Sequence, residues 1–134
     1  MLRSSQYVFS GVVVAGAIIY LLESLGHMVY PLPDDIDWTD PEALGNHIAG
    51  LPVLALILAL ITYVVGAICG GLISSLYRRS NIWHALITGL ILSMLGLLHL
   101  LVIPHPDWYV ITAVLLFIPF AWLGGLLGQQ LSSR

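Results

Sequence analysis

A carboxylate and an imidazole one helical turn apart are the residues of this sequence best placed to do chemistry. Glu23 and His27 are four positions apart within an otherwise apolar segment. Residues with this spacing share one face of a helix, so both side chains can reach a single ion or each other. A carboxylate among apolar residues is costly unless it is paired, protonated or directed into a polar interior. The pair therefore indicates a metal site, a proton- or cation-handling site, or a structural polar contact.

Further imidazole and phenol groups are available to complete such a site. His99 lies in a later apolar segment at a depth similar to that of His27, so Glu23, His27 and His99 converge if the two segments face each other. Two tyrosines lie on the same helical stripe as the pair, Tyr20 and Tyr30. Three loop residues could add ligands, His47, His105 and Asp107. Imidazole and carboxylate ligands suit zinc, iron, copper or manganese, so a converging set predicts a divalent transition metal.

Four apolar blocks must position these residues. Of the 134 residues, 59% are hydrophobic and 8% are charged, whereas a soluble domain carries about 25% charged residues. Each block exceeds the roughly 20 residues that a helix needs to cross a bilayer, and continuous apolarity is not the alternating pattern of a membrane β-barrel. We therefore predict a single all-α transmembrane domain over residues 1–134. Its four helices are expected at 7–30, 51–77, 82–103 and 108–131.

The composition argues against several classes of protein. The net charge is −3, so the chain lacks the basic surface of a nucleic-acid-binding protein. No glycine-rich phosphate loop follows a strand and no serine has a histidine and an acid at matching depth, so an enzyme is not the favoured interpretation. Cys69 is the single cysteine and is expected to pack as a small residue. Five hydroxyl residues within the spans are expected to bond backbone carbonyls, namely Thr62, Tyr63, Thr88, Ser93 and Thr112.

The placement of the charges predicts an orientation. All four basic residues flank the spans on one side, Arg3, Arg78, Arg79 and Arg134. Six of the seven acids lie on the other side, Asp34, Asp35, Asp37, Asp40, Glu42 and Asp107. Because positively charged segments stay in the cytoplasm, we expect both termini inside a bacterial inner membrane and the 31–50 loop in the periplasm. The first apolar run continues beyond Ala17 to Leu22, which favours a retained span over a cleaved signal peptide.

The two hairpins of the sequence resemble each other. One turns through Tyr30-Pro-Leu-Pro-Asp34 and the other through Ile103-Pro-His-Pro-Asp107, and Gly-Gly-Leu recurs at 70–72 and 124–126. The pattern predicts two parallel helical-hairpin repeats, although the same residues are also generic turn and packing chemistry. The first loop is longer, and Thr39-Asp40-Pro41-Glu42 within it predicts the start of a short interfacial helix over about Pro41 to Ala49.

Small residues predict where the helices meet. In lipid, helices associate through close approach at small side chains, and eight glycines lie at helical spacing: Gly66, Gly70, Gly71, Gly89, Gly96, Gly124, Gly125 and Gly128. Four helices need not bury all of these faces within one chain, so we expect some to serve an oligomer or a larger complex. Pro119 is expected to kink the last helix. His84, on the side of the arginines, could touch a lipid headgroup.

The segments Glu23-Ser-Leu-Gly-His27, Tyr30-Pro-Leu-Pro33 and Pro104-His-Pro-Asp-Trp108 resemble those of uncharacterised small bacterial inner-membrane proteins with four predicted spans. The resemblance covers most of the chain. It implies the four-span architecture and the importance of the Glu/His pair, and it implies no mechanism. Small multidrug exporters also have four helices and a first-helix glutamate, but here the glutamate lies toward the outer end, so that likeness is an architectural analogy.

Three functions fit this pattern. The first is a structural or accessory subunit, or an oligomer-forming component, of a membrane complex that carries an outer-leaflet Glu/His site. The second is a channel- or transporter-like module that moves protons or cations through Glu23 and His27, and the third is a membrane metalloprotein. Ionisable residues within the membrane are concentrated in its outer half and four short helices enclose little volume, which favours the first. The expected partners are the lipid bilayer and copies of this chain or other membrane proteins, and not nucleic acid.

Overall fold

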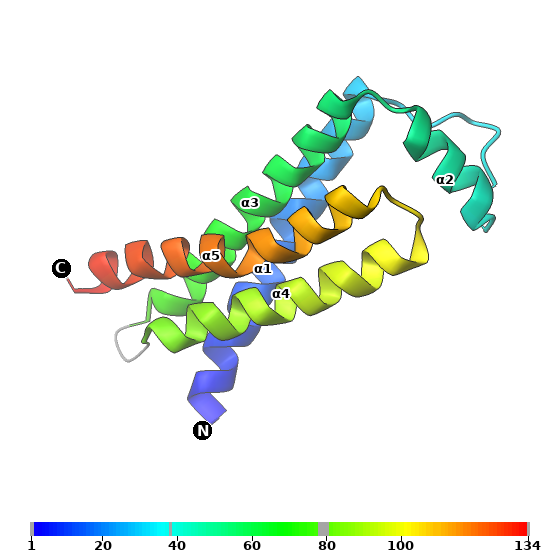
Figure 1. Ribbon diagram of the computed structural model, residues 1–134. Coiled ribbons are helices and arrows are strands. Elements are labelled where there is room, and N and C mark those ends of the chain that lie inside the picture. Colours follow the sequence, from blue (N-terminus) through cyan, green and yellow to red (C-terminus); the bar gives the residue numbers. More distant parts are fainter. Residues whose placement is uncertain (1, 38, 78–80, 134) are drawn as a thin grey trace.

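The protein is all-helical over the residues that its computed structural model describes, which are 2–37, 39–77 and 81–133 (Figure 1). The helices are α1 (Leu2–Val29), α2 (Pro41–Gly50), α3 (Val53–Ser75), α4 (Ile82–Val102) and α5 (Asp107–Ser132). All except α2 are long and apolar enough to cross a membrane. The prediction of an all-helical chain with four long apolar helices, and one short helix between the first two, is confirmed. Three residues of the sequence argument lie outside the described part, Arg78, Arg79 and Arg134, as does the side chain of Arg3.

The helix boundaries follow local chemistry more closely than hydropathy. α1 begins at Leu2, five positions before the predicted start at residue 7. Hydropathy marks the edge of the bilayer, whereas backbone hydrogen bonding continues through the polar residues beyond that edge. Prolines set two other boundaries, because Pro52 and Pro106 precede α3 and α5 in an extended conformation.

The short helix α2 begins as its sequence predicts. The carboxylate of Asp40 accepts a hydrogen bond from the backbone N–H of Glu42 at 2.9 Å, and Pro41 occupies the first turn. The preceding turn is held by Asp37, which accepts hydrogen bonds from the backbone N–H and the hydroxyl of Thr39 at 2.8 and 2.7 Å. These two bonds lower the pKa of Asp37. The chain therefore enters α2 through a turn that its own side chains define.

The long helices form two crossing pairs. α1 packs on α3 and α4 packs on α5, while α3 and α5 make the most extensive contact of the bundle. Figure 1 shows the two pairs crossing, so that α1 and α4 lie close near the N-terminus and diverge toward α2. We call the end with both chain termini the terminal end and the opposite end the α2 end. The axis of α5, which contains Pro119, changes direction near its middle (Figure 1).

The α3–α5 contact brings two backbones together. A Cβ atom added to Gly71 would collide with the backbone of Ala121, and one added to Gly124 would collide with the carbonyl of Ile68. A Cβ atom on Gly128 would lie 2.5 Å from the carbonyl oxygen of Leu72. Only hydrogen fits at such positions, which is how small residues let helices approach in lipid.

Glycines also make the contacts within each pair. On the α1–α3 side, a Cβ atom on Gly70 would lie 2.8 Å from both the Ala15 side chain and the Gly11 carbonyl oxygen, and Gly66 faces Ile19. On the α4–α5 side, a Cβ atom on Gly89 would lie 2.9 Å from the Cβ of Ala121. The two remaining predicted packing glycines meet the same partner helices, Gly96 against Phe117 and Gly125 against Ala85.

Candidate functional site

Glu23 meets tyrosine side chains from two other helices at the α2 end. Its half-buried carboxylate on α1 interacts with the hydroxyl of Tyr63 on α3, and that hydroxyl also interacts with the hydroxyl of Tyr109 on α5. Both tyrosines are buried, with 7% of Tyr63 and 1% of Tyr109 exposed. Because both hydroxyls are buried, each needs a hydrogen-bond partner, since a buried hydroxyl or carboxylate without a hydrogen-bond partner destabilises the fold.

His105 extends this contact out of the bundle. Its ring stacks on Tyr109 with centroids 5.1 Å apart, and its Nδ1 lies 2.7 Å from the carbonyl oxygen of Ile103. A carbonyl oxygen only accepts hydrogen bonds, so Nδ1 carries a proton and donates it. Burial lowers the pKa of His105, which leaves the ring neutral at pH 7 with its Nε2 lone pair available. We call Glu23, Tyr63, Tyr109 and His105 the polar chain.

Aromatic rings fix the orientation of the polar chain. Phe117 packs on Tyr63 with ring centroids 5.5 Å apart, and Trp108 meets Tyr109 edge-on at 5.9 Å. Gly96 on α4 makes room for Phe117, since a Cβ atom there would lie 2.7 Å from the Phe117 ring. These contacts hold the tyrosines between apolar surfaces, so their hydroxyls have few partners other than one another and Glu23.

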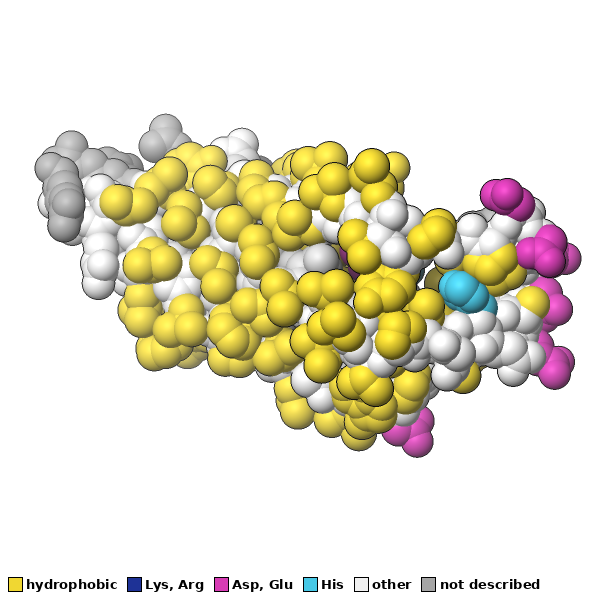
Figure 2. Space-filling model, turned by 90° about the horizontal axis from the view of Figure 1, so that it is seen from above, with side chains coloured by type: hydrophobic (Ala, Val, Ile, Leu, Met, Phe, Trp, Pro, Cys, Tyr) yellow, Lys and Arg dark blue, Asp and Glu magenta, His cyan; other side chains and the backbone are white. Residues whose placement is uncertain are grey.

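A cleft lies beside the outer end of the polar chain. It encloses about 560 Å³ between α2 and the turn that joins α4 to α5, and His105 is part of its wall. Its other lining residues are Pro41, Glu42, Gly45, Asn46, Ala49, Pro104 and Pro106. Figure 2 shows acidic side chains gathered at this end of the molecule. The polar chain therefore connects the interior of the bundle with the acidic surface at the α2 end.

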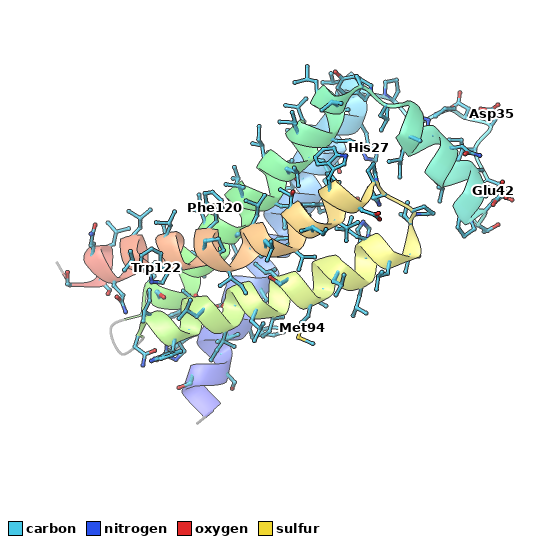
Figure 3. The ribbon with its side chains drawn as sticks, viewed as in Figure 1. His27, Asp35, Glu42, Met94, Phe120 and Trp122 are labelled. Carbon is cyan, nitrogen blue, oxygen red and sulfur yellow. The ribbon has the colours of Figure 1, made fainter. Side chains whose placement is uncertain are left out.

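The other predicted site residues lie apart from the polar chain. Tyr20 and His27 are exposed on the surface of α1, with 71% of Tyr20 accessible. Figure 3 places His27 at the α2 end, as it does the acidic Asp35 and Glu42. His99 is exposed on α4, although its charge acts on His105. Tyr30 and His47 are half-buried, and Asp107 is exposed at the start of α5.

The structure does not gather the predicted metal ligands. Among the residues described, no group of three or more histidine, cysteine, aspartate or glutamate side chains is arranged to hold a metal ion, and this applies to Glu23, His27 and His99. The physical reason is the helix arrangement. α1 and α4 diverge toward the α2 end, so Glu23 faces α3 and meets Tyr63 where His99 was expected (Figure 1).

Tyr63 and Tyr109 were absent from the predicted site. The expectation that hydroxyls within the spans bond backbone carbonyls is confirmed for three threonines, where Thr62, Thr88 and Thr112 bond carbonyls of their own helices at 2.7, 2.8 and 2.6 Å. Ser93 of α4 also bonds a backbone carbonyl as expected, that of Val114 on α5 at 2.9 Å. A tyrosine hydroxyl projects too far to return to its own helix backbone, so Tyr63 needs a partner on a neighbouring helix. The length of the tyrosine side chain, together with Glu23 as the one charged residue within a predicted span, is the sequence signal that could have identified the Tyr63–Glu23 contact.

Comparison of the chain with protein-family models, curated proteins and solved structures finds no match.

Proposed function

We propose that this protein is an integral membrane protein that assembles with further membrane helices, as an oligomer-forming or accessory component of a membrane complex. The observation that carries the proposal is the exposed polar face of α1, formed by Gly16, Tyr20, Ser24 and His27. These residues follow one another at helical spacing and would face lipid in a single copy of the chain. Exposed imidazole and phenol groups within a span are unfavourable in lipid, and small residues beside them allow another helix to approach closely.

The burial of the four spans supports a partner at α1. In its most apolar stretch, 11% of the residues of α1 are buried, compared with 28% or more in each of the other spans. The first helix is thus the one that the rest of the bundle covers least. A helix from a second copy, or from another membrane protein, would bury the polar face and complete the packing of α1.

The orientation of the protein in its membrane, and its two hairpin repeats, are part of the same proposal. Acidic side chains at the α2 end and arginines in the sequence at the terminal end support cytoplasmic termini and a periplasmic α2 in a bacterial inner membrane. The pairing of α1 with α3 and of α4 with α5 is also what two parallel hairpin repeats would produce.

The test measures the mass of the particle released from membranes by a lipid-preserving polymer. We expect more than one protein chain in the wild-type particle and a single chain in Gly16→Leu, because leucine blocks close approach at the polar face. Gly26→Leu is the matched control. Neither glycine has a neighbour within 4 Å of an added Cβ atom, and the two lie on different sides of α1. A wild-type particle that holds one copy and no other protein contradicts the proposal.

A second candidate function, proton or cation handling, is favoured by the polar chain. A carboxylate only accepts hydrogen bonds and each tyrosine donates one. The arrangement that satisfies all three groups has Tyr109 donate to Tyr63 and Tyr63 donate to Glu23. Protonation of Glu23 would therefore reorganise the hydrogen bonds among Glu23, Tyr63 and Tyr109, and the ring of Tyr109 stacks on that of His105.

The packing below Glu23 limits this second function. Ile19 fills the space against Gly66, and a Cβ atom on Gly66 would lie 3.2 Å from the carbonyl oxygen of Ala15. A complete path through one copy would need these contacts to open. Purified protein in liposomes with an internal pH dye tests the function. Transport predicts flux that Glu23→Gln and Tyr63→Phe abolish and that Tyr20→Phe leaves intact, whereas no wild-type flux above that of empty vesicles contradicts it.

A further inference from the structure

We propose that the groove between α1 and α4 at the terminal end binds one anionic phospholipid of the adjoining leaflet. The groove encloses about 790 Å³, which lies within the range of about 300–1,000 Å³ of small-molecule sites. It forms where α1 and α4 cross and begin to diverge (Figure 1). The inference does not depend on the assembly of the protein, because both walls belong to one chain.

The groove changes in polarity along its length as a phospholipid does. Its mouth is lined by Ser4, Gln6 and Asn81, at the starts of the two helices. Farther along, its walls are aliphatic, with Val12 on α1 and Ile91 on α4. At about 1.5 Å per residue, Ile91 lies roughly 14 Å beyond the start of α4, which is close to one leaflet of a hydrocarbon core about 30 Å thick. The headgroup region and one acyl chain therefore match the two parts of the groove.

The mouth of the groove offers side-chain hydrogen-bond donors suited to phosphate, the hydroxyl of Ser4 and the amide of Gln6. Nδ1 of His84 lies 2.9 Å from the backbone nitrogen and 3.0 Å from the carbonyl oxygen of Asn81, so this ring nitrogen is held by the cap of α4. The Asn81 side chain meanwhile accepts from the backbone N–H of Trp83 at 3.0 Å. The cap of α4 is thus internally satisfied, and the groove wall beside it includes His84.

Charge and environment select the occupant. The groove lies along two helices that are long and apolar enough to cross a membrane, so lipid is the solvent that meets its aliphatic part. In the sequence, Arg3 directly precedes Ser4, and Arg78 and Arg79 shortly precede Asn81. Basic residues at a membrane surface attract anionic headgroups. The sequence next to the groove residues is therefore positively charged, which favours an anionic phospholipid over a neutral one as the occupant.

Native mass spectrometry of the full chain in detergent, with phosphatidylglycerol or phosphatidylcholine added, tests the proposal. We expect one tightly held phosphatidylglycerol per chain and weaker retention of phosphatidylcholine. Ile87→Trp fills the groove from the α4 wall and is expected to weaken lipid retention about tenfold through overpacking. Leu90→Trp is the matched control, because it makes the same change on an exposed residue of the same helix outside the groove.

A second variant separates lipid loss from misfolding. Val8→Trp fills the groove from the α1 wall, and helix content and thermal stability are measured for every variant. Lower retention in a folded groove variant, with wild-type retention in Leu90→Trp, supports the proposal. Equal retention in the groove variants and the control overturns it, as does equal retention of the two lipids. A dimer that Ile87→Trp dissociates also overturns it, because the occupant would then be a second copy.

Discussion

The ring of His105 stacks on the ring of Tyr109, with their planes inclined by 13°. This contact joins the turn between α4 and α5 to the buried hydroxyls of the bundle, and the same imidazole forms part of the cleft beneath α2. A change at the surface of the α2 end can therefore reach Glu23 through three side chains.

Removing the hydroxyl of Tyr63 should destabilise the protein. Tyr63→Phe keeps the ring that packs on Phe117 but leaves Glu23 and Tyr109 without their shared partner. We expect a loss of about 1–3 kcal/mol in the free energy of unfolding, the usual cost of an unsatisfied buried polar group. Denaturant titration of helix content measures it. Tyr20→Phe, on the exposed face of α1, is the control, and equal stability of the two variants would contradict the role assigned to Tyr63.

Lowering the pH should reduce the stability of the folded protein through protonation of His105. The folded protein lowers the pKa of His105 below its usual value of 6.5 because burial disfavours the imidazolium. The unfolded chain then binds more protons in the interval between the two pKa values, so stability rises with pH there. The stabilising contribution is complete above about pH 6.5 and is lost as the pH falls toward the folded pKa.

Thermal unfolding between pH 8 and pH 5 measures this dependence. Wild-type protein should lose stability over the interval, and His105→Gln should lose less, because glutamine does not titrate. His27→Gln is the control, since His27 is exposed on α1. An identical pH profile for wild type and His105→Gln would show that another group is responsible.

The sequence was sufficient to predict the elements of the fold. Apolar length identified the spans, turn chemistry placed α2, and the spacing of glycines such as Gly71 and Gly124 marked faces that do meet other helices. These features are local, because each depends on residues within a few turns of one another.

The partner of Glu23 was not predictable in the same way. The position of a residue along its helix does not determine which other helix will pack beside it. Whether Glu23 meets His99 or Tyr63 depends on α1 packing against α3 while diverging from α4, which is set by contacts near Gly11, Ala15 and Gly70 at a distance from the site. Periodicity within one segment contains no information about that choice.

Adding a side chain at the α3–α5 crossing should prevent the bundle from closing. Gly124→Leu places its Cβ against the backbone of Ile68, which cannot move without separating the two helices. We expect destabilisation of about 3 kcal/mol, at the upper end of overpacking costs. Gly26→Ala is the control, because an added Cβ there has no neighbour within 4 Å and removing a helical glycine gains up to about 1 kcal/mol. The two changes should therefore have opposite signs in the same unfolding experiment.

Displacing α2 should alter the environment of His105 while leaving the spans folded. α2 rests on the second hairpin turn at Gly45, where an added Cβ would lie 3.0 Å from the Cβ of Pro104. Gly45→Leu lengthens that side chain further, so we expect α2 to move away from Pro104 and water to reach the cleft. Burial would then no longer lower the pKa of His105, which should return toward 6.5.

Hydrogen exchange of the α2 amides and NMR titration of the His105 ring measure the two effects. Gly50→Leu, at the open end of α2, should change neither, and an unchanged His105 titration in Gly45→Leu would contradict the coupling of α2 to the polar chain.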